Sequence, residues 1–405
     1  MGKYTALDDP LVDQTIEDHM QQIVAAIRSR IEPRAIVLRG SFSQGEGSVV
    51  VEGNGLRFLS DYELVVITPH SRHRRWLRTV ARQMTAQLGV EISISRVHPY
   101  NIECNSLGNL PIGSIARPTI AMYEVQSGGR TLYGEHLLNR GPAIDPRTLD
   151  IWAGLRLMLN RMAESLGHLL QTDGDGETLY WINKTVLSCA EALLIVHGQY
   201  HFSYAERGRR FANLVPQLEP VLAPASHLPD LVRRATAFKL RPSLDLYPDP
   251  MPLTLQRVRQ ACDATFRYVI EKDLGFSFDG YAEFPALYLS QLRRQNKLGK
   301  SWLRPLPAPL AQNLLLVLKF LRARRWPPLG LITHPALPAY QVVFAVIPLL
   351  FLEGSDDVLQ EARHWLGRLR NLEPPRDERQ TEQAYLRHCT VQAWKDFCYG
   401  MWDAR

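Results

Sequence analysis

The chain has few cysteines, and none of them lies in a pattern typical of a metal site or a disulfide framework. Its 405 residues contain five cysteines, which stand far apart and include no CxxC pair. Such spacing argues against a zinc site and against a fold held by disulfides. Free thiols in a reducing compartment are the expected state, and we therefore predict a cytoplasmic protein.

Targeting and membrane-spanning segments are also missing from the sequence. The N-terminal residues show no basic-then-apolar signal peptide, and Ala6 stands where a myristoylation motif has Ser or Thr. The strongly apolar residues 340–352 are too few to cross a bilayer and include Pro348. We expect no transmembrane segment, and we predict a buried core helix over residues 340–352.

Acidic residues are absent from residues 284–352, although the net charge of the whole chain is only +6. The same segment carries nine basic residues, namely Arg293, Arg294, Lys297, Lys300, Arg304, Lys319, Arg322, Arg324 and Arg325. A block of this kind attracts phosphates, nucleic acid or an anionic membrane surface. We predict that Arg322, Arg324 and Arg325 bind a polyanionic or phosphorylated acceptor, with RNA among the candidates. A solvated basic face without a partner is the alternative.

Length and composition indicate a globular protein of more than one domain. Hydrophobic residues make up 45% and charged residues 22%, which is ordinary for globular chains, but 405 residues are many for a single core. We predict an α+β fold with a small mixed sheet flanked by helices in residues 1–142. A helical domain should follow over residues 143–270, and a helical, basic region over residues 271–405.

The expected elements come from hydrophobic periodicity and from the residues that interrupt it. In the first third, strands are expected at residues 35–38, 62–67, 90–95 and 120–125, with a helix at 71–88. Further along the chain, helical spacing is found at residues 151–170, 179–194, 253–272, 308–325, 355–371 and 380–400.

Two acidic residues open the second predicted strand. Because side chains alternate along a strand, Asp61 and Glu63 should share one face while Tyr62 and Leu64 point to the layer behind. Two carboxylates on one face are suited to Mg²⁺, which takes oxygen ligands and bridges to phosphates. Glu91, at the start of the next predicted strand, is the candidate third carboxylate.

A glycine and a serine follow the first predicted strand. Gly40 would let the backbone approach a phosphate closely, and Ser41 would donate its hydroxyl and amide hydrogens to that phosphate. Together with the carboxylates, these residues fit the transfer of a nucleotidyl group.

The order of these residues resembles the DNA-polymerase-β-like nucleotidyltransferase superfamily. The stretch Gly40-Ser41-Phe42-Ser43-Gln44-Gly45-Glu46 is similar to the glycine-serine box of the minimal nucleotidyltransferases. The stretch Ser60-Asp61-Tyr62-Glu63-Leu64-Val65-Val66 is similar to their metal box. The resemblance covers about the first third of the chain.

The resemblance implies roles for named residues. Asp61 and Glu63 would hold two Mg²⁺ or Mn²⁺ ions, and Glu91 would complete one metal site and orient or deprotonate the acceptor hydroxyl. Gly40 and Ser41 would hold the triphosphate of an NTP such as ATP.

The resemblance also implies that the helical domain over residues 143–270 completes the nucleotide cleft. Members of the superfamily place a lysine there against the triphosphate, and we predict Lys184 for this role. Tyr204 is similar in position to the residue that supplies a hydroxyl or a stacking ring to the nucleotide. An ordinary solvated lysine is the alternative for Lys184.

The expected activity is Mg²⁺-dependent transfer of NMP from an NTP to a hydroxyl acceptor, with release of pyrophosphate. RNA, a nucleotide and a phosphosugar remain open as acceptors. Nucleotidylation of a protein hydroxyl, as in toxin-like members, is a second reading. A catalytically inactive scaffold that binds RNA or a membrane surface is a third.

Overall fold

The structure is a computed structural model that describes most of the chain. The described residues are 2–53, 55–103, 119–169, 175–295, 297, 307–322, 325–328, 330–333, 337–370, 372 and 381–398. They divide into two compact units. The first comprises Met1–Gly154, Ala190–Pro220 and Ser226–Pro250, and the second comprises Leu155–Cys189, Val221–Ala225 and Met251–Arg405. Parts of the predicted middle segment 143–270 therefore belong to each unit.

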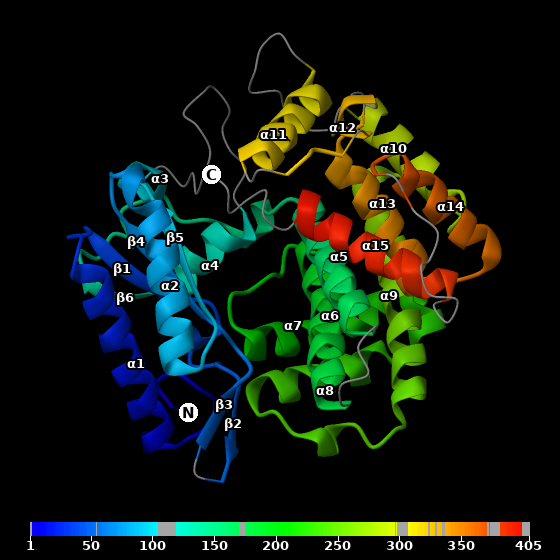
Figure 1. Cartoon of the computed structure of the whole chain (residues 1–405). Coiled ribbons are helices and arrows are strands. Elements are labelled where there is room, and N and C mark those ends of the chain that lie inside the picture. Colours follow the sequence, from blue (N-terminus) through cyan, green and yellow to red (C-terminus); the bar gives the residue numbers. More distant parts are fainter. Residues whose placement is uncertain are drawn as a thin grey trace. The chain divides into compact units, whose positions relative to one another are not determined.

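A four-stranded mixed sheet forms the centre of the first unit, with strand order β5-β4-β1-β6 (Figure 1). Its strands are β1 (Ala35–Arg39), β4 (Tyr62–Ile67), β5 (Ile92–Val97) and β6 (Arg130–Gly134). β1 runs antiparallel to β4 and β6, whereas β4 and β5 are parallel. A separate hairpin consists of β2 (Val49–Glu52) and β3 (Gly55–Phe58). The predicted small mixed sheet is confirmed.

Helices cover both faces of this sheet. On one face, α1 (Pro10–Arg28) and α2 (Arg74–Leu88) bury their apolar stripes against alternate strand residues such as Leu38 and Leu64. On the other face, α3 (Pro99–Glu103) and α4 (Ile120–Gly128) contribute Ile102 and Val125 to a smaller cluster. The period of two in the strands therefore matches burial on both faces.

The segment predicted as a strand over residues 120–125 is a helix, α4, and that prediction was wrong. Thr119 caps its N-terminus, because its hydroxyl accepts a hydrogen bond from the Met122 amide at 3.2 Å. Met122 and Val125, three residues apart, are both buried. The cap and the helical spacing outweigh the strand propensity of this short apolar stretch.

The remainder of the chain is helical. Its helices are α5 (Ile151–His168), α6 (Asp175–Val196), α7 (Tyr204–Leu222), α8 (Leu228–Leu240), α9 (Met251–Leu274), α10 (Phe284–Arg294), α11 (Ala308–Arg322), α12 (Gly330–Thr333), α13 (Ala339–Leu352), α14 (Asp356–Gly367) and α15 (Glu382–Phe397). Short 3-10 turns are η1 (Ser41–Gln44), η2 (Ser71–His73), η3 (Pro146–Thr148), η4 (Ala223–Ala225) and η5 (Leu244–Leu246). Each helix predicted beyond residue 150 has a counterpart here.

The second unit is built around α13, which lies buried among neighbouring helices of that unit, including α9, α10, α14 and α15. This confirms the core helix predicted over residues 340–352. Inside the unit, the Tyr288 hydroxyl donates to Gln341 Oε1 at 2.5 Å, which satisfies the polar side chain of a buried helix position. One segment of α6, Thr178–Val196, is long and apolar enough to span a bilayer, but most of it is buried, as in a core helix.

Candidate active site

The glycine-serine segment begins where β1 ends, beside the start of β4. Arg39, the last residue of β1, pairs in antiparallel register with Glu63 of β4. Gly40 follows with φ of 73° and ψ of −161°, a backbone conformation that is essentially restricted to glycine. The chain therefore leaves the sheet directly beside Glu63.

The carboxylate of Glu63 lies against the backbone of Gly40. A Cβ atom added to Gly40 would stand 2.5 Å from Glu63 Oε2, closer than non-bonded atoms approach one another. The other oxygen, Glu63 Oε1, accepts a hydrogen bond from Arg39 Nη2 at 2.8 Å. The structure thus brings together two of the predicted site residues, Gly40 and Glu63, and adds Arg39 as a neighbour.

Asp61 is the residue before β4 and is partly exposed, whereas Tyr62 and Leu64 are buried. Because side chains alternate along a strand, Asp61 and Glu63 lie on the side of the sheet opposite these two residues. Burial raises the pKa of the Tyr62 phenol, which contacts His19 Nδ1 at 3.0 Å and stays protonated. The expected separation of acidic and apolar faces is present.

Glu91 is the residue before β5, the parallel neighbour of β4. The register pairs Tyr62 with Ile92, and the Tyr62 amide donates to the Glu91 carbonyl oxygen at 2.9 Å. Asp61 and Glu91, which precede these two partners, are therefore neighbours at the same end of the sheet. The side chain of Glu91 is exposed.

The residue types at this end of the sheet fit a hard divalent cation, because carboxylate oxygens are its preferred ligands. Within the described ranges, however, no three His, Cys, Asp or Glu side chains are grouped closely enough to hold a metal ion. The ion pair with Arg39 directs the Glu63 carboxylate toward Gly40. Asp61 and Glu63 are the donors that best fit a metal, and Glu91 stays a predicted third ligand.

Ser41 opens the 3-10 turn η1, and the turn is anchored by its neighbours. The Glu46 amide donates to the Ser41 carbonyl oxygen at 2.9 Å. Phe42 is buried, with its ring centroid 4.8 Å from that of Tyr62. Because one turn residue packs into the core, the half-buried Ser41 is held at a fixed place beside Gly40.

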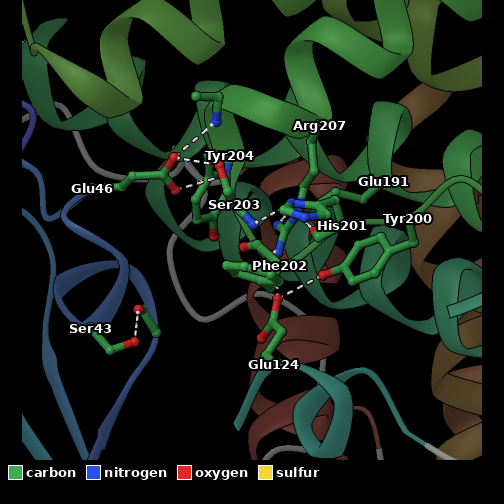
Figure 2. A network of polar contacts seen from close by, with 12 residues as sticks. Ser43, Glu46, Glu124, Glu191, Tyr200, His201, Phe202, Ser203, Tyr204 and Arg207 are labelled. Carbon is green, nitrogen blue, oxygen red and sulfur yellow. Dashed lines mark hydrogen bonds and ion pairs between the residues drawn. The ribbon is translucent and has the colours of Figure 1, made fainter. Parts of the chain in front are cut away.

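The segment is also attached to the start of α7 through Glu46, which is 1% exposed. Figure 2 shows its carboxylate directed at this helix end, where it accepts hydrogen bonds from the Tyr204 amide and the Ser203 hydroxyl, both at 2.7 Å. The Ala205 amide donates to it as well, at 3.1 Å. An acidic side chain at a helix N-terminus satisfies unpaired amides and the helix dipole. Glu46 therefore fixes Tyr204 relative to the glycine-serine segment.

Lys239, near the end of α8, reaches the same region of the first unit. Its ammonium donates to Ser60 Oγ at 2.8 Å and lies 5.0 Å from the ring centroid of Tyr204. Its carbonyl oxygen accepts a hydrogen bond from Ser48 Oγ at 2.6 Å. Since Ser60 immediately precedes Asp61, a lysine and the predicted Tyr204 both lie beside the acidic strand.

A buried arginine stabilises the loop that leads to Tyr204. Arg207 is 4% exposed and pairs with Glu191 and with Glu124, the latter at 2.5 Å. Tyr200, whose pKa is raised by burial, donates its hydroxyl to Glu124 at 2.7 Å (Figure 2). The network joins α4, the end of α6 and the start of α7 within the first unit.

The other predicted residues belong to the second unit. Lys184 belongs to the second unit, where its ammonium lies 4.6 Å and 4.4 Å from the ring centroids of Tyr180 and Trp181. Arg322 is exposed at the end of α11, whereas Arg325 pairs with Asp396 at 3.1 Å. Arg324 lies outside the described residues.

The sequence reasoning missed Arg39, Glu46, Ser60 and Lys239. Ser203-Tyr204-Ala205-Glu206 has the S-x-x-E pattern of a helix start, and this signal predicts where α7 begins. Lys239 has no such local signal, because it is 179 positions away from the Ser60 hydroxyl that it contacts. Comparison of the chain with protein-family models, curated proteins and solved structures finds no match.

Proposed function

We propose that this chain is a Mg²⁺-dependent nucleotidyltransferase that transfers NMP from an NTP to a hydroxyl acceptor and releases pyrophosphate. The observation that carries the proposal is the contact between Gly40 and Glu63. A glycine-serine turn and an acidic strand are each common. Their meeting at one end of one sheet is what nucleotidyl transfer requires.

Asp61 and Glu63 would hold the metal, which when bound neutralises charge on the phosphates. The amides and hydroxyl of Gly40 and Ser41 would bind phosphate oxygens. Lys239 would supply a cation from the first unit, because its ammonium lies beside Ser60 there. As a point charge it would hold the triphosphate against the acidic strand. The role of Lys184, in the second unit, stays a prediction.

Two further residues have supporting roles. Arg39 would orient Glu63 through the 2.8 Å ion pair, and Tyr204, fixed by Glu46, would offer its ring or hydroxyl to the nucleotide. Glu91 Oε1 or Oε2 would take the proton of the acceptor hydroxyl, since it is exposed next to Asp61.

The test is pyrophosphate release with each NTP, with and without Mg²⁺, for the wild type and for Asp61→Asn and Glu63→Gln. Metal stabilisation of phosphate charge contributes several kcal/mol, so each variant should lose about 10²-fold or more of the activity. Glu52→Gln is the matched control, because Glu52 is an exposed carboxylate paired with Arg57 on the β2–β3 hairpin. The absence of metal-dependent pyrophosphate release with every NTP would reject the proposal. Equal activity in Asp61→Asn, Glu63→Gln and Glu52→Gln would reject it as well.

A further inference from the structure

The segment that follows β4, made of η2 and α2, is rich in arginine. Residues 64–90 contain no Asp or Glu, and five arginines, namely Arg72, Arg74, Arg75, Arg78 and Arg82, fall within eleven positions. Like charges three and four residues apart on a helix repel one another and lower its stability. Because the segment itself supplies no acidic partner for these side chains, the cluster points to a role other than folding.

The arginines and the apolar residues of α2 lie on different faces. Leu77, Val80, Ala81 and Met84 are buried against the sheet. Arg72, Arg75 and Arg82 are exposed, and the last two are seven residues apart, which places them on one face of the helix. The helical stretch from Arg74 to Arg82 extends over roughly 12 Å along the helix axis.

Neighbouring elements add charge at the beginning of α2. Arg30 follows α1 and lies 5.9 Å from the ring centroid of Trp76 on α2. Arg96 of β5 donates to the carbonyl oxygen of Thr68 just before the helix. Burial, followed by the charges of Arg72, His70, Arg30 and Arg96, lowers the pKa of His73, which agrees with this gathering of cations.

These arginines differ from three other exposed arginines of the first unit, namely Arg147, Arg209 and Arg233. Among the described residues, no carboxylate pairs with Arg72, Arg75 or Arg82, and Arg82 Nε donates to the Arg78 carbonyl oxygen at 3.4 Å. By contrast, Arg147, Arg209 and Arg233 are 63–76% exposed, and each pairs with a nearby acid at 2.5–2.6 Å. The charge of Arg72, Arg75 and Arg82 is thus available to an external anion.

The chemistry of the surface favours a phosphate polymer over a membrane. An interfacial helix needs an exposed apolar face beside its cations, and the described residues of α2 include no large apolar side chain that is exposed. Guanidinium groups bind phosphates bidentately. Several of them along one helix face match successive phosphates of a nucleic-acid strand.

We propose that the exposed arginines of this segment, Arg72 in η2 with Arg75 and Arg82 on α2, together with Arg30, bind a nucleic-acid strand through its phosphates. The inference rests on the proposed function only in identifying that strand as the acceptor. α2 runs back from the end of β4 to the start of β5, where Glu91 lies. A nucleic-acid strand bound along α2 therefore extends toward the acidic end of the sheet.

The experiment measures binding of labelled single-stranded RNA and DNA, about 20 nucleotides long to exceed the site size of such surfaces, by fluorescence anisotropy without NTP or Mg²⁺. The Arg72→Gln/Arg75→Gln/Arg82→Gln variant should bind about 100-fold more weakly at 0.1 M salt. The slope of log affinity against log salt should fall in magnitude by about 2, or 0.7 for each lost phosphate contact. The matched control is Arg147→Gln/Arg209→Gln/Arg233→Gln, which removes the same total charge and should bind like the wild type.

Equal losses in the two triple variants would mean that only net charge matters and would overturn the proposal. Unchanged oligonucleotide binding in both triple variants would also overturn it. So would a loss of binding that occurs only in an Arg322→Gln/Arg325→Gln variant. Binding to phosphatidylserine vesicles but to neither oligonucleotide would overturn it in favour of a membrane. Because the Asp61→Asn chain should bind the oligonucleotide normally, failure of the proposed catalysis is distinguishable from failure of this inference.

Discussion

The carboxylate of Glu63 occupies the space that a side chain at position 40 would need, with its Oε2 atom 2.5 Å from the place of a Cβ on Gly40. Two residues 23 positions apart are thus in close contact, and a side chain at position 40 would require the Glu63 carboxylate to move. Gly40 is needed for its positive φ of 73° and also for this close approach. The relationship links the phosphate-binding turn to the acidic strand.

Gly40→Ala should therefore damage both folding and activity. A positive φ costs Ala about 1–3 kcal/mol, and the added methyl group should also displace Glu63. Since a displacement of about 1 Å at a reacting centre costs roughly 10²-fold, pyrophosphate release should fall by about that factor. Thermal unfolding and initial rates measure the two effects separately.

Gly89→Ala is the matched control for this change. Gly89 ends α2 with φ of 68°, and nothing lies within 4 Å of a Cβ added there. This variant should lose about 1 kcal/mol of stability and keep its activity. Similar activity losses in the two variants would show that the contact with Glu63 does not matter for catalysis.

The local part of the fold was predictable from sequence, because it follows from periodicity and from glycine. β1 and β4 are short apolar runs next to turn residues, and α2 has a clear helical stripe that ends at Gly89. α4 was mistaken for a strand because a nine-residue helix offers few repeats, so the Thr119 cap was the better signal.

Contacts distant in sequence were not predictable. Glu46 was visible inside the glycine-serine segment, but its attachment to the start of α7 depends on how α7 packs in the first unit. For the same reason, no local pattern predicts the contact between Lys239 and Ser60, which only the tertiary structure of the first unit reveals. The role of Lys184, in the second unit, stays a prediction.

Lys239→Met should weaken NTP binding more than it weakens folding. Loss of a hydrogen bond to a charged phosphate costs about 1.5–3 kcal/mol, so KM for the NTP should rise about 10- to 100-fold. Ser60→Ala is the control, because it removes the 2.8 Å hydrogen bond to Lys239 and leaves the ammonium in place. Equal changes of KM in both variants would indicate that the contact is structural, with no role for the lysine in binding phosphate.

Arg207→Met should strongly destabilise the protein, because it removes the buried guanidinium that pairs with both Glu191 and Glu124. Removing one side of a buried ion pair costs about 3–5 kcal/mol. Arg209→Met, on the same helix but 63% exposed, should cost about 1 kcal/mol or less. Urea unfolding of both variants tests the difference, and a cost below 1 kcal/mol for Arg207→Met would contradict the view that this network stabilises the loop before α7.

Glu206→Gln should remove a contribution to stability that depends on pH. Hydrogen bonds from Arg209 and then Arg210 lower the pKa of Glu206 from 4.5 to about 2. A depressed pKa means that the folded state favours the charged carboxylate. Its stabilising effect is therefore complete above about pH 5 and is lost as the pH falls toward 2. Because these pairs are partly exposed to solvent, the effect should be about 0.5–1 kcal/mol.

Measured as Tm, the wild type should exceed Glu206→Gln by about 1–3 °C between pH 7 and pH 5. The difference in Tm should then narrow and vanish near pH 2. Protonation removes the negative charge of Glu206 from the wild type, and the substitution has already removed it from the variant. Glu219→Gln, an exposed position on the same helix, should match the wild type throughout. A gap that stays constant down to pH 2 would place the effect of the substitution in packing or helix propensity, because neither depends on the charge of residue 206.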